Sequence, residues 1–147
     1  MRWIISLCVL ILVGCVQVDD GTITTPIDTK PDTEFANSDK EIVAKLIAAP
    51  ELQDAALLRK YAAYCKGAAE LIRNQTDVPL TDILTGVKKS NAVFIGVKSP
   101  TLQKIAVGLL PESGGAEDDR AAIAAKWDSL SVSCHAAAHQ LDKQPAK

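Results

Sequence analysis

Two histidines give this chain its clearest chance of metal chemistry. His135 and His139 stand four residues apart in the segment His-Ala-Ala-Ala-His. On a helix this spacing puts both imidazole rings on one face, where they can chelate a divalent cation. Asp128 and Asp142 fall on the same face, but the chain has no third histidine and lacks the glutamate of the His-Glu-x-x-His motif. We expect two solvent-exposed histidines near a helix C-terminus, and a metal site is the alternative.

Cys134 and His135 match the last two residues of the Cys-x-x-Cys-His motif that attaches c-type haem. The motif also needs a cysteine three residues before Cys134. Ser131 occupies that earlier position, so the sequence gives haem little support. The Gly-x-Ser-x-Gly motif, the P-loop and the Rossmann glycine pattern do not occur in the sequence either. We therefore expect no cofactor and no enzymatic activity. A metal- or haem-handling envelope protein that uses His135 and His139 is the alternative function.

The first residues have the pattern of an export signal. Arg2 and the N-terminal amine are positively charged, and Trp3 to Val13 form an apolar run that only Ser6 interrupts. This run fits the roughly 7–15 apolar residues of a secretory signal. It is short for a membrane-spanning helix, which needs about 20 apolar residues.

The apolar run ends in Leu12-Val13-Gly14-Cys15, which resembles the lipobox of bacterial lipoproteins. The resemblance covers residues 1–15. It implies that residues 1–14 are a cleaved signal peptide, with the cut between Gly14 and Cys15. It also implies a diacylglyceryl group on the sulfur of Cys15 and, in Gram-negative bacteria, an acyl chain such as palmitate on its amino group. Several acyl chains hold a protein stably at a membrane, whereas one does so only marginally. An uncleaved signal anchor and a plain secretory peptide are the alternatives.

The residues after Cys15 indicate the membrane to which the protein is sorted and how the folded part is linked to it. In Gram-negative lipoproteins an aspartate next to the lipidated cysteine often signals retention in the inner membrane, and this chain has Val16 there. We expect the outer membrane if the host is Gram-negative, with the protein facing the periplasm or the cell surface. Residues 15–37 are then the lipidated cysteine and a flexible tether, because Thr, Asp, Pro and Gly dominate them and no hydrophobic period is present.

Two of the four cysteines remain once Cys8 leaves with the signal peptide and Cys15 carries lipid. Cys65 and Cys134 each lie near the middle of an apolar stripe, in a compartment that permits disulfides. We expect a disulfide between them. It would close a loop of about 70 residues, for which chain entropy gives about 4 kcal/mol. The alternative is two unpaired thiols that act as small hydrophobic side chains.

Beyond residue 37, apolar residues recur at helical spacing in five segments. The alanine-rich composition, with only 4% aromatic residues, favours helices over strands. Alanines within the stripes indicate close helix approach rather than a large ligand cavity. We expect helices over residues 38–49, 50–74, 81–95, 99–110 and 116–141. The expected inward residues are Ile42, Val43, Leu46, Ile47, Leu58, Tyr61, Cys65, Ala68, Ile72, Ile83, Leu84, Val87, Phe94, Ile95, Leu102, Ile105, Ala106, Leu109, Ile123, Trp127, Leu130, Cys134, Ala137 and Leu141.

Local signals mark where these helices begin. Ser38 and Glu41 form a capping box, and Pro50 suits the first turn of the second helix. Ser99 and Pro100 suit the start of the fourth helix. Three acidic residues, Glu117 to Asp119, favour the first turn of the fifth.

These patterns predict an all-α fold, a small bundle of four to five helices over residues 38–141 after a disordered tether, with a frayed tail at 142–147. The net charge of −2 provides no basic excess to neutralise phosphates, so we expect no nucleic-acid partner. We expect a lipid-anchored module of the cell envelope with a structural or protein-interaction role. Its partners would be the membrane, through the lipid, and an envelope protein.

Overall fold

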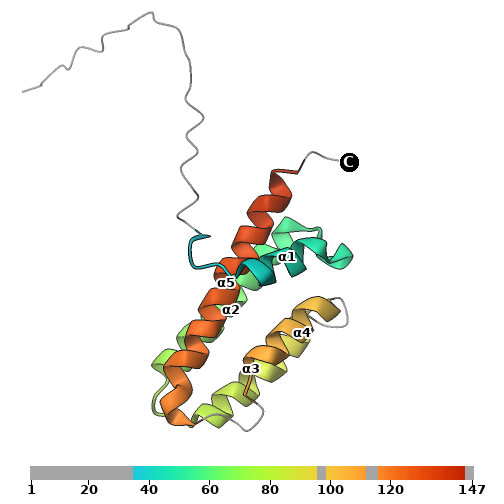
Figure 1. Ribbon diagram of the computed structural model, residues 1–147. Helices are drawn as coiled ribbons and strands as arrows, with labels where there is room; N and C mark the ends of the chain where they lie inside the picture. The colour runs from blue at the N-terminus through green and yellow to red at the C-terminus, as the bar shows by residue number, and fades with distance from the viewer. Residues whose placement is uncertain (1–34, 96–98, 112–115, 145–147) are drawn as a thin grey trace, which may run out of the picture. The chain divides into compact units, whose positions relative to one another are not determined.

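The computed structural model describes residues 35–95, 99–111 and 116–144, all within one compact unit that spans Asp32–Lys147. These residues form five α-helices and no strand, which confirms the predicted all-α bundle (Figure 1). The expected signal peptide, Cys15 and the tether up to residue 34 lie outside the described residues. The elements are α1 (Lys40–Ala48), the 3-10 helix η2 (Pro50–Leu52), α2 (Ala55–Asn74), α3 (Leu80–Ile95), α4 (Pro100–Leu109), the 3-10 helix η4 (Glu117–Asp119) and α5 (Arg120–Asp142).

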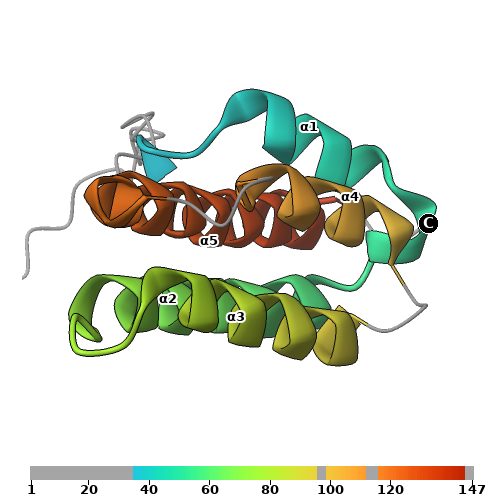
Figure 2. The same ribbon diagram turned by 90° about the horizontal axis from the view of Figure 1, so that it is seen from below.

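The two longest helices, α2 and α5, form the centre of the bundle. They run antiparallel and contact each other along most of their length (Figure 1). The hydroxyl of Ser131 donates to the carbonyl of Ala62 at 2.7 Å, which joins a side chain of α5 to the backbone of α2. α1 packs on α5, and α4 lies beside α1 and α3 (Figure 2). None of the described helices is both long and apolar enough to cross a membrane.

The predicted core stripes of α2 and α5 are confirmed almost completely. All five expected residues of α2 are buried, and so are all those of α5 except Leu141, which is half-buried. Alanines fill much of the space between the two helices, so their backbones approach closely, as the composition predicted. The fully buried alanines of this pair are Ala62, Ala69, Ala124, Ala137 and Ala138.

The start of α1 differs from the predicted capping box. Asp39, not Ser38, is the N-cap, because its carboxylate accepts from the backbone N–H groups of Glu41 (2.9 Å) and Ile42 (3.2 Å). The backbone N–H of Asp39 donates to the hydroxyl of Ser133 at 2.9 Å. This bond ties the first residue of the helix cap to α5, a contact between residues 94 positions apart in the chain.

The second helix was predicted to begin at Pro50, and that boundary is wrong. Pro50–Leu52 form the separate helix η2, and α2 starts after Asp54, whose carboxylate accepts from the N–H of Ala56 at 2.8 Å. The side-chain amide of Gln53 donates to the carbonyls of Ile47 and Ala49, at 2.9 Å each. These bonds satisfy carbonyls at the end of α1 and stabilise a turn where the sequence suggested a continuous helix.

In α3, the inward face is shorter than predicted. Ile83, Leu84 and Val87 are buried as expected, but Phe94 is 42% exposed. Asn91 takes the inward position and is 4% exposed, because its side-chain oxygen accepts from the hydroxyl of Tyr61 at 2.8 Å. A hydrogen-bonded asparagine therefore continues the buried face of α3, at a position that the predicted apolar stripe did not include.

The fourth helix begins as predicted, with Ser99 as N-cap and Pro100 in the first turn. The fifth begins later than predicted, since Glu117–Asp119 form η4 and α5 starts at Arg120. Ile105 and Leu109 of α4 are only half-buried, and they pack against the edge of the core.

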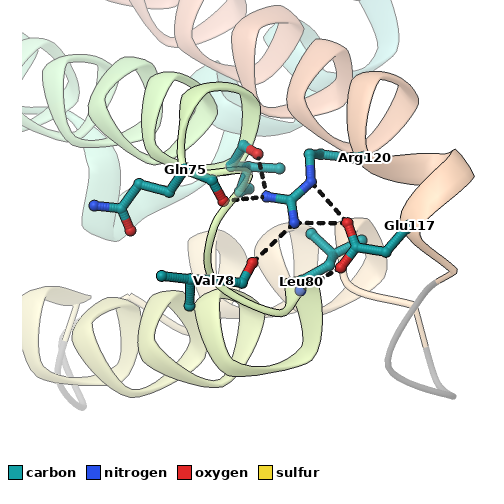
Figure 3. Close-up of polar contacts among 6 residues, drawn as sticks. Gln75, Val78, Leu80, Glu117 and Arg120 are labelled. Atoms are coloured by element: carbon teal, nitrogen blue, oxygen red, sulfur yellow. Dashed lines mark hydrogen bonds and ion pairs between the residues drawn. The ribbon is translucent and has the colours of Figure 1, made fainter.

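Arg120 is a buried cation that organises the turn between α2 and α3 (Figure 3). Its guanidinium donates to the carbonyls of Ile72 (2.9 Å), Gln75 (2.8 Å) and Val78 (3.0 Å). These are carbonyls at and beyond the C-terminal end of α2, where intrahelical donors run out. The arginine thus stabilises the end of one helix from the start of another.

Glu117 completes this cluster on the other side (Figure 3). One carboxylate oxygen accepts from Nη2 and Nε of Arg120, at 2.6 and 3.0 Å. The other accepts from the backbone N–H of Leu80, at the start of α3, at 2.8 Å. The Leu80 hydrogen bond and then Arg120 hold the pKa of Glu117 below its usual value.

Candidate functional site

The two histidines lie on the same side of α5, as their spacing predicted, and both line one hollow. His135 and His139 line a surface cavity of about 370 Å³ together with Phe35, Arg59 and Val132. His135 is exposed as expected, but His139 is half-buried, so the expectation of two solvent-exposed histidines is wrong for His139. The ring of Phe35 lies 5.4 Å from that of His139, tilted by 44°. This contact fixes the orientation of one of the two imidazoles.

The surroundings of the histidines are less suited to a metal ion than the sequence suggested. The guanidinium of Arg59 lines the same hollow and forms an ion pair with Asp142. The other aspartate on this face, Asp128, pairs with Arg73. Within the described residues, no group of three His, Cys, Asp or Glu side chains is placed to hold a metal ion. A nearby fixed cation also raises the energy of a bound metal cation.

Cys65 and Cys134 are free thiols in the structure, so the predicted disulfide is not present in it. Both are completely buried, on the facing stripes of α2 and α5. Burial raises the pKa of both thiols, that of Cys134 to about 12, so each stays neutral at physiological pH. Neutral buried thiols pack as small hydrophobic side chains, which is the alternative the sequence left open.

Aromatic rings gather where α2, α3 and α5 meet. Tyr64 stacks on Phe94 at 5.3 Å and meets the edge of Trp127 at 6.2 Å. The hydroxyl of Tyr64 donates to the carbonyl of Val87 at 2.9 Å, which fixes the ring between the two helices. Next to this cluster Val93 is 85% exposed, so the end of α3 presents two large apolar side chains to solvent.

A larger hollow lies between α1, η2 and α4, and sequence reasoning missed it. It is an open groove of about 780 Å³. Its apolar lining consists of Ile42, Ala48, Ala49, Pro50, Ile105, Gly108 and Leu109. The sequence signal was the spacing of the α4 residues, since positions 101, 104, 105, 108 and 109 share one helical face. Two residues of that face, Ile105 and Leu109, were expected to point into the core.

One end of this groove is fixed by a link between η2 and α4. The carboxylate of Glu51 accepts from the hydroxyl of Thr101 at 2.7 Å and from its backbone N–H at 3.3 Å. The Thr101 hydroxyl is the main cause that lowers the pKa of Glu51. Because this carboxylate also lies at the N-terminus of α4, it interacts favourably with the helix dipole.

Two lysines give the groove its charge. Lys45 of α1 and Lys104 of α4 both line it, and none of the described residues that line it is acidic. Lys45 pairs with Glu41 on the exposed side of α1 at 2.7 Å. Lys104 makes no ion pair within the described part of the chain. The groove therefore combines an apolar surface with positive charge.

Comparison of this chain with protein-family models, with curated proteins and with solved structures found no match.

Proposed function

We propose that this protein is a lipid-anchored helical module of the bacterial cell envelope, with a protein-interaction or structural role and no catalytic activity of its own. The observation that carries the proposal is the apolar run that starts at Trp3 and ends in the lipobox-like Leu12-Val13-Gly14-Cys15. Lipid on Cys15 would hold the protein at a membrane. The outer membrane is the proposed location if the host is Gram-negative.

The compact unit supports such a role because it has its own hydrophobic core. The buried residues of all five helices form one continuous cluster within Asp32–Lys147. A unit of this kind needs no membrane-embedded surface to fold. It fits a domain displayed at a membrane by an N-terminal anchor.

Two exposed apolar side chains at the end of α3 support contact with another protein. Val93 is 85% exposed and Phe94 is 42% exposed. Phe94 stacks on Tyr64, so its ring is held in place before any partner arrives. Fixed aromatic groups lose little conformational entropy on binding and are common anchors at interfaces.

The anchor is tested by the intact mass of the protein purified from bacterial membranes without reductant. We expect the mass of residues 15–147 plus acyl groups, and a Cys15→Ser variant that keeps the whole chain without added lipid. A wild-type mass equal to the unmodified 147 residues would overturn the proposal. The same result would favour an uncleaved signal anchor.

The interaction role is tested by a photoreactive amino acid introduced at Val93 in living cells. We expect covalent adducts with one envelope protein, which disappear when Phe94 is changed to serine. The matched control places the same group at Lys66, an exposed position on α2. Adducts of the same identity and yield from both positions would show nonspecific contact and contradict an interface at the end of α3.

A further inference from the structure

We propose that the groove between α1 and α4 binds an anionic single-chain amphiphile, of which a fatty acid is the simplest example. The acyl chain would lie on the apolar lining, and the anionic head would lie near Lys45 and Lys104. This ligand site goes beyond the proposed interaction role and does not depend on whether Cys15 is lipidated.

The apolar lining exists because the apolar stripes of α1 and α4 extend beyond the residues that the core covers. Val43 and Leu46 of α1, and Leu102 and Ala106 of α4, face the core. Ile42 and Ile105 lie beside these residues, at the edge of the core, and are only half-buried. An acyl chain bound in this groove would remove its own apolar surface and that of the lining from water, which favours binding.

The charge of the groove selects the sign of the head group. Lys45 and Lys104 bring two ammonium groups, and no carboxylate lies among the described lining residues. The nearest acidic side chain on η2, Glu51, is already bonded to Thr101. Glu41 already pairs with Lys45, so Lys104, which makes no ion pair within the described residues, is the better contact for an anionic head.

The size of the groove favours a small molecule over a protein helix. Its volume of about 780 Å³ lies within the roughly 300–1,000 Å³ of small-ligand sites. The wall formed by α4 has 10 residues and so is about 15 Å long. A flexible chain can follow such a short wall, whereas a partner helix would gain contact over only two or three turns.

Gly108 offers a way to fill the groove without disturbing the fold. It lines this groove and also a second hollow of about 430 Å³ with Lys88 and Val107. A Cβ atom added at Gly108 would meet nothing within 4 Å. Gly86 of α3 is equally open and does not line the groove, so it is the matched control. Both changes to leucine replace a glycine within a helix by a better helix former.

The test uses the full chain in phosphatidylcholine nanodiscs and a photoactivatable palmitate. We expect adducts in the peptides that cover residues 42–50 and 101–109, and competition by palmitate but not by hexadecylamine. Gly108→Leu should lower the adduct yield about tenfold, because the ligand must displace a side chain, and Gly86→Leu should not. Unchanged melting temperatures would show that both variants fold.

Three results would overturn the proposal. The first is labelling spread evenly over all helices, and the second is an undiminished yield in Gly108→Leu. The third is competition by hexadecylamine as strong as that by palmitate. For the charge, Lys104→Gln should weaken palmitate competition about two- to fivefold and Lys66→Gln should not, since exposed ion pairs contribute modestly. An equal effect of the two changes would contradict the role of Lys104.

Other occupants are distinguished by a photoreactive residue at Lys104. If palmitate fills the groove, adding palmitate should suppress any protein adduct formed from this position. A covalent dimer that palmitate does not suppress would show a second copy of the chain in the groove. A palmitate-insensitive adduct with another envelope protein would show a protein ligand. Either result would overturn the proposal.

Discussion

At the scale of single residues, Arg120 carries more structural weight than any other polar side chain described. Changing it to methionine leaves the carbonyls of Ile72, Gln75 and Val78 without their donor and removes the partner of Glu117. We expect unfolding free energy to fall by about 3 kcal/mol, measured by urea denaturation. Arg73→Met removes an exposed pair and should cost less than about 1 kcal/mol. Equal losses would contradict this account.

Acid should weaken the same cluster through Glu117. Its folded pKa is lowered, so its stabilising effect is complete above the unfolded pKa, near 4.5, and is lost as the pH falls through the folded value. Glu51 acts in the same direction. We expect the melting temperature to fall below about pH 4.5, and Glu117→Gln to show a smaller fall over that window. An identical pH profile in the variant would assign the acid sensitivity to other carboxylates.

Metal binding by His135 and His139 also depends on single side chains. Because Arg59 lies in the hollow with both imidazoles, we expect only weak zinc binding, with the same affinity for the wild type and for His139→Ala. Isothermal titration measures both. A wild-type affinity at least about tenfold higher would revive the metal-handling alternative that uses His135 and His139.

At the scale of elements, the α2–α5 pair should protect its thiols. Cys65 and Cys134 are fully buried and neutral. We expect neither to react with iodoacetamide in the folded protein, and both to react without reductant once the protein is unfolded. Mass spectrometry counts the modified residues. Failure of both to react in the unfolded, unreduced protein would show that they are joined as a disulfide.

Periodicity predicted the elements well where helices pack in a regular way. The stripes of α2 and α5 were found because each faces a long partner, so every third or fourth residue is apolar. Local signals were less reliable at the helix starts. Ser38 and Pro50 looked like good first residues, but the carboxylates of Asp39 and Asp54 cap the first turns of α1 and α2.

The parts that sequence reasoning missed depend on long-range geometry. The partners of Arg120 are backbone carbonyls 42–48 residues away, and no side-chain pattern marks them. The groove between α1 and α4 requires knowing that these two helices are neighbours. Single-sequence patterns say which face of a helix is apolar, but not whether a neighbour covers it.

At the scale of the whole molecule, stability should be uneven. Eleven residues of α5 are buried, whereas only Leu102 and Ala106 of α4 are. We expect backbone amide hydrogen exchange to be slowest in α2 and α5. The free energy of opening measured for α4 should be much lower. Equal protection of α4 and α5 would show that the bundle opens as a single cooperative unit and would contradict this prediction.

The bond between Asp39 and Ser133 has a mechanical consequence. The N–H of Asp39 is held by α5, and the ring of Phe35 rests on His139 of the same helix. Tension applied to the chain ahead of Phe35 therefore enters the molecule through its longest helix instead of unwinding α1 from its free end. The pull is then resisted by the core contacts between α5 and α2. This arrangement would help a protein anchored to a membrane by its N-terminus to stay folded under tension.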